Sequence, residues 1–172
     1  LDVAPALYSR AAILAALGSP PPQYNNFTPM AQTLEAAALE PTLVDADAYG
    51  KHLFLRFDDG RTLHAHLLMT GSFEVGRPSR ESEWRRRVEL WLDNGRLTGV
   101  AVPLLGMLAT ADEHEITDAL GPDLCAVAGP PDIDEILERM RRDPWAPLAG
   151  AMLDQRNAAG LGNIYANDVP FV

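Results

Sequence analysis

The stretch of this sequence best suited to chemistry is LDQRNAAGLGNIYAN, residues 153–167. Its AAGLGN segment places Gly160 and Gly162 just ahead of Asn163, at the start of a segment that resembles a helix. Glycines let a backbone approach another molecule closely, and successive N–H groups ahead of a helix can be aimed at one anion. The segment fits a phosphate-binding turn. An ordinary glycine-containing connection between two helices fits the same pattern.

Histidine and cysteine offer no metal site in this sequence. His64 and His66 alternate as residues of a strand do, and Cys125 is the lone cysteine. One cysteine excludes an intrachain disulfide and a cysteine-rich zinc site within these residues. We therefore expect no metal ion.

Length and composition indicate a globular protein. The 172 residues are 47% hydrophobic, which is enough to form a core. No apolar run approaches the roughly 18 residues of a membrane span, and the start, LDVAPALYSR, lacks the order of a signal peptide. We expect a cytoplasmic monomer with no membrane partner.

The charge is unevenly distributed along the chain. The net charge of -10 argues against a polyanionic partner, yet Arg10 is the only base among the first 50 residues, and arginines gather between Arg77 and Arg96. Any anion site therefore lies in the second or last third. The run from Trp84 to Arg87 could contact phosphate, or it could be a solvated sheet face.

The elements that must position these residues change character along the chain. Residues 5–17 have helical spacing and stop at Gly18. Between about residues 42 and 103, apolar and alternating segments separated by the DDG and DNG turns predict an antiparallel sheet or sandwich. The strand segments are KHLFLRF, RTLHAHLLM, GSFEVG, RRVELWLD and RLTGVAV.

Helical patterns follow Pro103. ATADEHEITDAL, DIDEILERMRR with Asp132 or Asp134 at its start, and WAPLAGAMLDQ predict helices, with a linker near residues 121–131. We therefore expect an α+β fold, with an N-terminal helix and an antiparallel β-sandwich followed by a helical domain.

Three motifs together resemble one family of DNA repair enzymes. LDQRNAAGLGNIYAND, AYGKHLFLRFDDGRTLHAHLLMTGSFEVG and LGPDL are similar to formamidopyrimidine-DNA glycosylase and endonuclease VIII, in that family's order, over residues 49–172. The resemblance implies a β-sandwich domain, here residues 1–108, and a partial helix–two-turns–helix domain, here residues 109–172. It implies a base-excision glycosylase and abasic-site lyase that acts by base flipping on damaged duplex or single-stranded DNA.

The resemblance also implies residue roles on the sandwich side. Lys51 resembles a lysine that contacts DNA phosphate near the lesion and assists catalysis, and His66 a histidine that contacts phosphate. Met69 resembles the apolar wedge that fills the gap left by the everted base, because inserted apolar surface partly offsets the cost of unstacking. Without the resemblance, Lys51 would be a solvated charge and Met69 a core residue.

On the helical side, Asn163 resembles the asparagine that binds the DNA backbone beside the damaged nucleotide. Arg156 is a further candidate for DNA binding. Asp154, two residues before Arg156, suits a structural role, and the two side chains together could cap or orient the turn.

The start of the sequence departs from the family. Family members begin, after removal of methionine, with Pro-Glu, in which the proline amine forms a Schiff base and the glutamate moves protons. Counting back from Lys51 places this pair near Asp2 and Val3, or at Leu1 and Asp2 with a shift of one residue. In the first alignment the Asp2 carboxylate cannot form an imine and Val3 cannot move a proton. If Leu1 is the first residue of the natural chain, its primary amine could attack in place of proline, with Asp2 as a shorter substitute for the glutamate. Asp2 and Lys51 are the candidate catalytic residues.

The end of the sequence departs as well. The last residue, Val172, directly follows the two-turn motif, so the family's zinc finger and its phosphate-binding arginine are missing from this sequence. We therefore expect no zinc and no other cofactor. Where the family carries an arginine-bearing loop, this chain has only the apolar segment VAVPLLGML. We therefore expect a lower affinity for DNA.

Three interpretations remain open from the sequence. The chain is an active glycosylase and lyase, a catalytically silent relative that binds DNA or a protein partner, or a truncated product without a selected function. The family resemblance favours the first, and the missing Pro-Glu favours the second.

Overall fold

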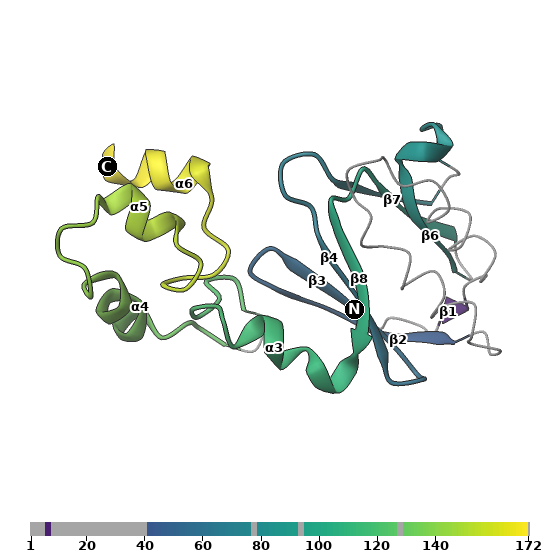
Figure 1. The fold of residues 1–172 in the computed structure, drawn as a ribbon, viewed down its shortest axis with the longest axis horizontal. Coiled ribbons are helices and arrows are strands. Elements are labelled where there is room, and N and C mark those ends of the chain that lie inside the picture. The colour runs from purple at the N-terminus through teal and green to yellow at the C-terminus, as the bar shows by residue number, and fades with distance from the viewer. Residues whose placement is uncertain (1–5, 8–40, 77–78, 93–94, 127–128, 172) are drawn as a thin grey trace. The chain divides into compact units, whose positions relative to one another are not determined.

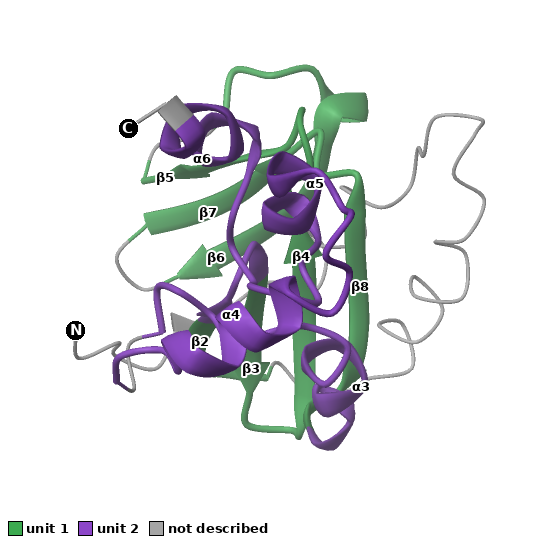
Figure 2. Ribbon diagram, turned by 90° about the vertical axis from the view of Figure 1, so that its left-hand side faces the viewer, with its two compact units in different colours: residues 1–47, 53–110 green, residues 48–52, 111–172 purple. Residues whose placement is uncertain are grey.

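The computed structural model describes residues 6–7, 41–76, 79–92, 95–126 and 129–171. Contacts divide the chain into two compact units: residues 1–47 with 53–110, and residues 48–52 with 111–172 (Figure 2). The turn at residues 48–52 thus groups with the helical part of the chain. The domain boundary expected between residues 108 and 109 stays a prediction.

The first unit contains a five-stranded sheet that holds most of the predicted strands. Its strand order is β1-β2-β3-β4-β8, and β4 pairs with β8 in antiparallel register (Figure 1). The strands are β1 (Ala6–Leu7), β2 (Thr42–Tyr49), β3 (His52–Phe57), β4 (Arg61–His66) and β8 (Leu104–Ala109).

A three-stranded antiparallel sheet completes this unit. Its order is β5-β7-β6, with β5 at Ser72–Val75, β7 at Gly95–Val100 and β6 at Arg86–Leu92, and a short 3-10 turn, η2, at Glu83–Arg85. The strands of both sheets either alternate between apolar and polar residues or are continuously apolar, as half-buried and buried strands are. Apolar side chains from both sheets form one core: Leu43, Leu55, Phe57, Leu63, Ala65, Val88, Leu90, Val102 and Leu105. The predicted sandwich and the α+β class are confirmed.

Two details of the first unit differ from the sequence-based expectation. The sheet does not end near residue 103, because Leu104–Ala109 forms β8 along β4. This apolar run follows a proline and lacks alternation, so its pattern did not identify a strand. In the expected helix over residues 5–17, Ala6 and Leu7 instead pair with β2, and the other positions lie outside the described residues.

The second unit is built of short helices. They are α3 (His114–Thr117), α4 (Ile133–Met140), α5 (Leu148–Leu153) and α6 (Asn163–Asp168), with 3-10 turns η3 (Thr110–Asp112) and η4 (Val169–Phe171) at the ends of this region. Asp132 caps α4, because its carboxylate accepts the N–H of Glu135 at 2.9 Å. Within the described ranges, no helix is long and apolar enough to span a membrane.

The segment expected to be a linker is in part packed structure. Asp123 forms a parallel β-bridge with Ala159 and is 5% exposed, and Gly121 donates its N–H to the carbonyl of Gln155 at 2.8 Å. The prolines and glycines of residues 121–131 indicated a linker, but the first residues of this segment hold the two-turn motif in place.

Candidate functional site

The two-turn motif is closed by one side chain, that of Gln155. Its amide nitrogen donates to the carbonyls of Leu153 and Leu161 at 2.8 and 2.9 Å, and its amide oxygen accepts the N–H of Gly160 at 3.0 Å. One side chain thereby satisfies backbone groups on both sides of the turns. The sequence pattern predicted no role for Gln155, although this residue lies within the LDQRNAAGLGNIYAN motif.

Asp154 and Arg156 form an ion pair at the first turn. The Asp154 carboxylate accepts a hydrogen bond from the Arg156 backbone N–H at 3.0 Å. It also accepts hydrogen bonds from the Arg156 guanidinium at 2.6 to 3.1 Å. The guanidinium hydrogen bonds, followed by the backbone one, lower the pKa of Asp154 from 3.8 to about 2. The Asp154 carboxylate raises the pKa of Arg156 above its ordinary value. The contact fits the expected orienting role, and DNA binding by Arg156 stays a prediction.

Lys51 lies against the second turn. Gly50 has a positive φ of 59°, so the chain turns sharply just before Lys51. The Lys51 ammonium donates to the carbonyl of Leu161, which also accepts from Gln155. A Cβ added at Gly162 would lie 3.7 Å from Lys51 Nζ. The absence of a side chain at Gly162 therefore leaves space beside the ammonium group.

Asn163 follows directly and is the first residue of α6. It is exposed, and its side-chain amide makes no hydrogen bond to any residue that the structure describes. Its backbone carbonyl accepts from the Asn167 amide at 2.7 Å, which fixes the first turn of the helix. The structure therefore brings Lys51 and the start of α6 together, and it leaves the amide of Asn163 available to a ligand.

Asp123 holds the turn that carries Lys51. Its two carboxylate oxygens accept the N–H groups of Gly50 and Cys125 at 3.0 and 2.9 Å. Tyr49 adds a hydrogen bond from its hydroxyl to the Gly121 carbonyl at 3.0 Å. Asp123 belongs to the LGPDL motif, but nothing in its local pattern indicates a partner 73 residues away.

His66 and Met69 belong to the first unit, at the end of β4 and in the turn after it. His66 Nδ1 accepts the N–H of Leu68 at 3.0 Å, and Leu68 has a positive φ of 47°. Met69 is 89% exposed. The expectation without the family resemblance, that Met69 is a core residue, is therefore wrong. An apolar side chain held in solvent by a strained turn suits a wedge.

Three further expectations concern Asp2, a metal site and the run from Trp84 to Arg87. Asp2 lies outside the described residues. No cluster of three or more His, Cys, Asp or Glu side chains among the described residues is placed to hold a metal ion. In the run from Trp84 to Arg87, Arg87 is 6% exposed and Trp84 is 61% exposed, so the run as a whole is not a solvated sheet face.

Residues 12–101 match the family model for the formamidopyrimidine-DNA glycosylase N-terminal domain. The chain belongs to this family. The match covers more than half of the chain and includes Lys51, His66 and Met69.

Curated relatives support this membership. The chain is 38% identical over 138 residues to "Probable endonuclease 8 2" of Streptomyces coelicolor, a match to 76% of this chain and 48% of that protein. It is 35% identical over 123 residues to "DNA-(apurinic or apyrimidinic site) lyase Nei2" of Mycolicibacterium smegmatis, a match to 72% of this chain and 47% of that protein. The chain thus spans about half the length of these relatives.

Solved structures of the family share the fold. The MutM (Fpg) protein of Thermus thermophilus superposes with a TM-score of 0.62 at 31% identity, over 78% of this chain and 49% of that chain. The Lactococcus lactis Fpg in complex with an abasic site containing DNA gives a TM-score of 0.67 at 21% identity, over 86% and 55%.

Proposed function

We propose that this chain, as a monomer in the cytoplasm, binds damaged DNA and serves in base excision as a DNA glycosylase with abasic-site lyase activity. The observation that carries the proposal is the placement of the Lys51 ammonium on the Leu161 carbonyl, next to Gly162 and the start of α6. The relatives' names as endonuclease and abasic-site lyase support it.

The geometry suits a DNA phosphate. An ammonium group, a glycine without a side chain and an asparagine amide without a partner among the described residues lie along one short segment. A phosphate oxygen there would gain a charge-assisted hydrogen bond from Lys51 and a neutral one from Asn163. The net charge of -10 makes this local cation important, because the chain as a whole repels a polyanion.

The lyase step requires an amine of the protein. The amine nitrogen bonds to the aldehyde carbon of the opened abasic sugar, and water leaves to give an imine. A base then removes a proton from the neighbouring sugar carbon, and the 3′ phosphate leaves with the electron pair of its C–O bond. We assign the proton transfers to Asp2 and the binding of the phosphate to Lys51. None of these steps requires a cofactor.

Borohydride trapping on a duplex that contains an abasic site tests the activity. Reduction of the imine joins the protein to DNA, and the adduct is read as a slow band on a denaturing gel. We expect a band from the wild type, and a much weaker one from Asn163→Ala because positioning is lost. Arg141→Ala is the control, since it also lies in the second unit, is exposed and removes one positive charge.

The other outcomes separate the alternatives. Binding that depends on Asn163, with no band, would overturn the lyase activity and leave a DNA-binding protein. A duplex that binds the wild type and Asn163→Ala equally would overturn the phosphate site itself.

A further inference from the structure

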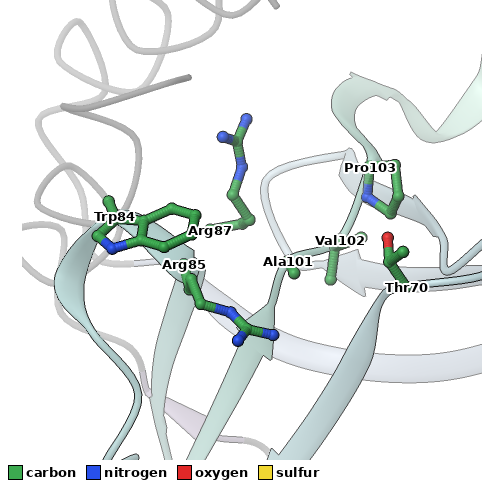
Figure 3. A pocket seen from close by; sticks show the side chains of 7 residues that line it. All are labelled: Thr70, Trp84, Arg85, Arg87, Ala101, Val102 and Pro103. Atoms are coloured by element: carbon green, nitrogen blue, oxygen red, sulfur yellow. The ribbon is translucent and has the colours of Figure 1, made fainter.

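A second candidate site lies in the first unit, in a cavity beside Trp84. The cavity measures about 150 Å³ and is lined by Thr70, Trp84, Arg85, Arg87, Ala101, Val102 and Pro103. Figure 3 shows Trp84 and Arg87 on one side of it, with Thr70 and Pro103 on the other. We call it the Trp84 cavity.

We propose that the Trp84 cavity receives one unpaired nucleobase of the bound DNA, which stacks on Trp84 while Arg85 contacts the adjoining phosphate. This inference rests on the proposed function, and it adds a base-binding role for Trp84 that none of the roles above includes.

The chemistry of the lining fits a base. Trp84 is 61% exposed, so a large aromatic residue at this cavity is accessible to a ligand. Ala101, Val102 and Pro103 supply an apolar surface, and the Thr70 hydroxyl can donate to or accept from a base edge. Aromatic side chains bind bases of any sequence, because every base presents a π-face.

The size of the cavity limits the ligand. The cavity, about 150 Å³ in volume and open to solvent, has room for an aromatic ring against Trp84, and we expect the sugar and phosphate to lie at its open edge. Arg85 lies at this outer edge with its side chain 40% exposed. Its guanidinium is 5.9 Å from the Trp84 ring centroid, at the limit of a cation–π contact, and 3.5 Å from Glu81. Both contacts are weak enough for a phosphate to replace them.

The position of the cavity connects it to Met69. Thr70 directly follows Met69, and a Cβ added at Gly71 would lie 3.1 Å from the Val102 Cα, so this turn packs on the cavity wall. Ala101 has a positive φ of 48° and donates its N–H to the Arg85 carbonyl at 2.6 Å. Strained non-glycine residues gather at functional sites. A base that the Met69 wedge unstacks would have an aromatic surface close by in the same loop cluster.

Tryptophan fluorescence provides the test. The sequence holds three tryptophans, so the double variant Trp91→Phe/Trp145→Phe leaves Trp84 as the sole emitter. A single-stranded oligonucleotide of mixed sequence is compared with an abasic oligomer of the same length, which carries the phosphates without the bases. We expect quenching by the oligonucleotide alone. Equal quenching by both would overturn the proposal, because it would show phosphate binding without a base.

Affinity measurements on single variants complete the test. We expect Trp84→Ala to weaken oligonucleotide binding about tenfold, as for the loss of one stacked base, and Trp84→Phe to restore most of it. Trp91→Ala is the matched control. Trp91 lies in the same unit, is also partly exposed, and has the Arg96 guanidinium carbon 4.4 Å from its ring centroid. Equal affinities of Trp84→Ala and Trp91→Ala would overturn the proposal.

Asn163→Ala separates the two proposals. Binding that falls in Asn163→Ala but not in Trp84→Ala would overturn the Trp84 cavity alone. A wild type that binds no DNA would overturn both.

Discussion

The carboxylate of Asp123 accepts the backbone N–H of Gly50 at 3.0 Å, although the two residues are 73 positions apart. This contact fixes the turn whose next residue is Lys51. Because the other oxygen of the same carboxylate accepts the Cys125 N–H, one buried side chain organises two separate backbone segments of the second unit.

Replacing Asp123 should therefore destabilise the second unit. In Asp123→Asn one oxygen becomes an NH₂ group that faces a backbone donor, and an unsatisfied buried N–H costs about 1–3 kcal/mol. Denaturant unfolding measures this loss. Asp118→Asn is the control, since Asp118 is exposed, and an equal loss in both variants would contradict the role of Asp123.

Gly121 should tolerate no side chain. A Cβ at this position would lie 2.5 Å from the backbone carbonyl carbon and oxygen of Asn157, so Gly121→Ala should cost about 1–3 kcal/mol or more in unfolding free energy. Gly150→Ala is the matched variant, because its Cβ meets nothing within 4 Å and lies in α5. We expect this second change to stabilise the protein, by up to about 1 kcal/mol. Thermal unfolding of both variants measures these changes in stability. A Gly121→Ala protein of wild-type stability would contradict the prediction that the Asn157 backbone excludes a side chain at this position.

The Asp154–Arg156 pair should contribute stability that is lost in acid. The folded pKa of Asp154, about 2, is below its ordinary 3.8. The unfolded chain therefore takes up the proton first as the pH falls, and the contribution is complete above pH 3.8 and disappears as the pH drops toward 2. Solvent screening keeps the effect of such a surface pair small.

An NMR titration of the Asp154 carboxyl carbon checks this directly. We expect a midpoint near 2 in the wild type and a midpoint closer to 3.8 in Arg156→Ala, where the guanidinium bonds are lost. Unchanged midpoints in the two proteins would show that Arg156 does not hold this carboxylate.

Met69→Ala should leave stability unchanged and weaken the binding of an abasic duplex. The side chain is 89% exposed, so its removal opens no cavity in the core, whereas a wedge contributes apolar surface to the DNA complex. Val75→Ala is the control, since Val75 is 79% exposed in the same unit. Equal duplex affinities for the two variants would exclude the wedge role.

The sequence predicted the fold well where the pattern was local. Alternation and turn residues identified β3 to β7, and a capping aspartate marked the start of α4 at Asp132. The pattern missed β8, because a continuous apolar run after Pro103 carries no period. Short-range reasoning could also not place Asp123, whose partner Gly50 lies 73 positions away. Gln155 bonds backbone groups of its own motif that come together only once the two turns have formed. The family resemblance supplied Lys51 and Asn163, and the structure added the reason for Lys51: a hydrogen bond to a carbonyl 110 positions away.

The central claim is that Lys51, held on the two-turn motif, binds a DNA phosphate. The most direct measurement is the salt dependence of duplex affinity for the wild type, Lys51→Ala and Arg141→Ala. Loss of one phosphate contact should reduce the slope of log K against log salt by about 0.9 in Lys51→Ala, and Arg141→Ala should keep the wild-type slope. Equal slopes for all three proteins, or equal reductions in both variants, would contradict the claim.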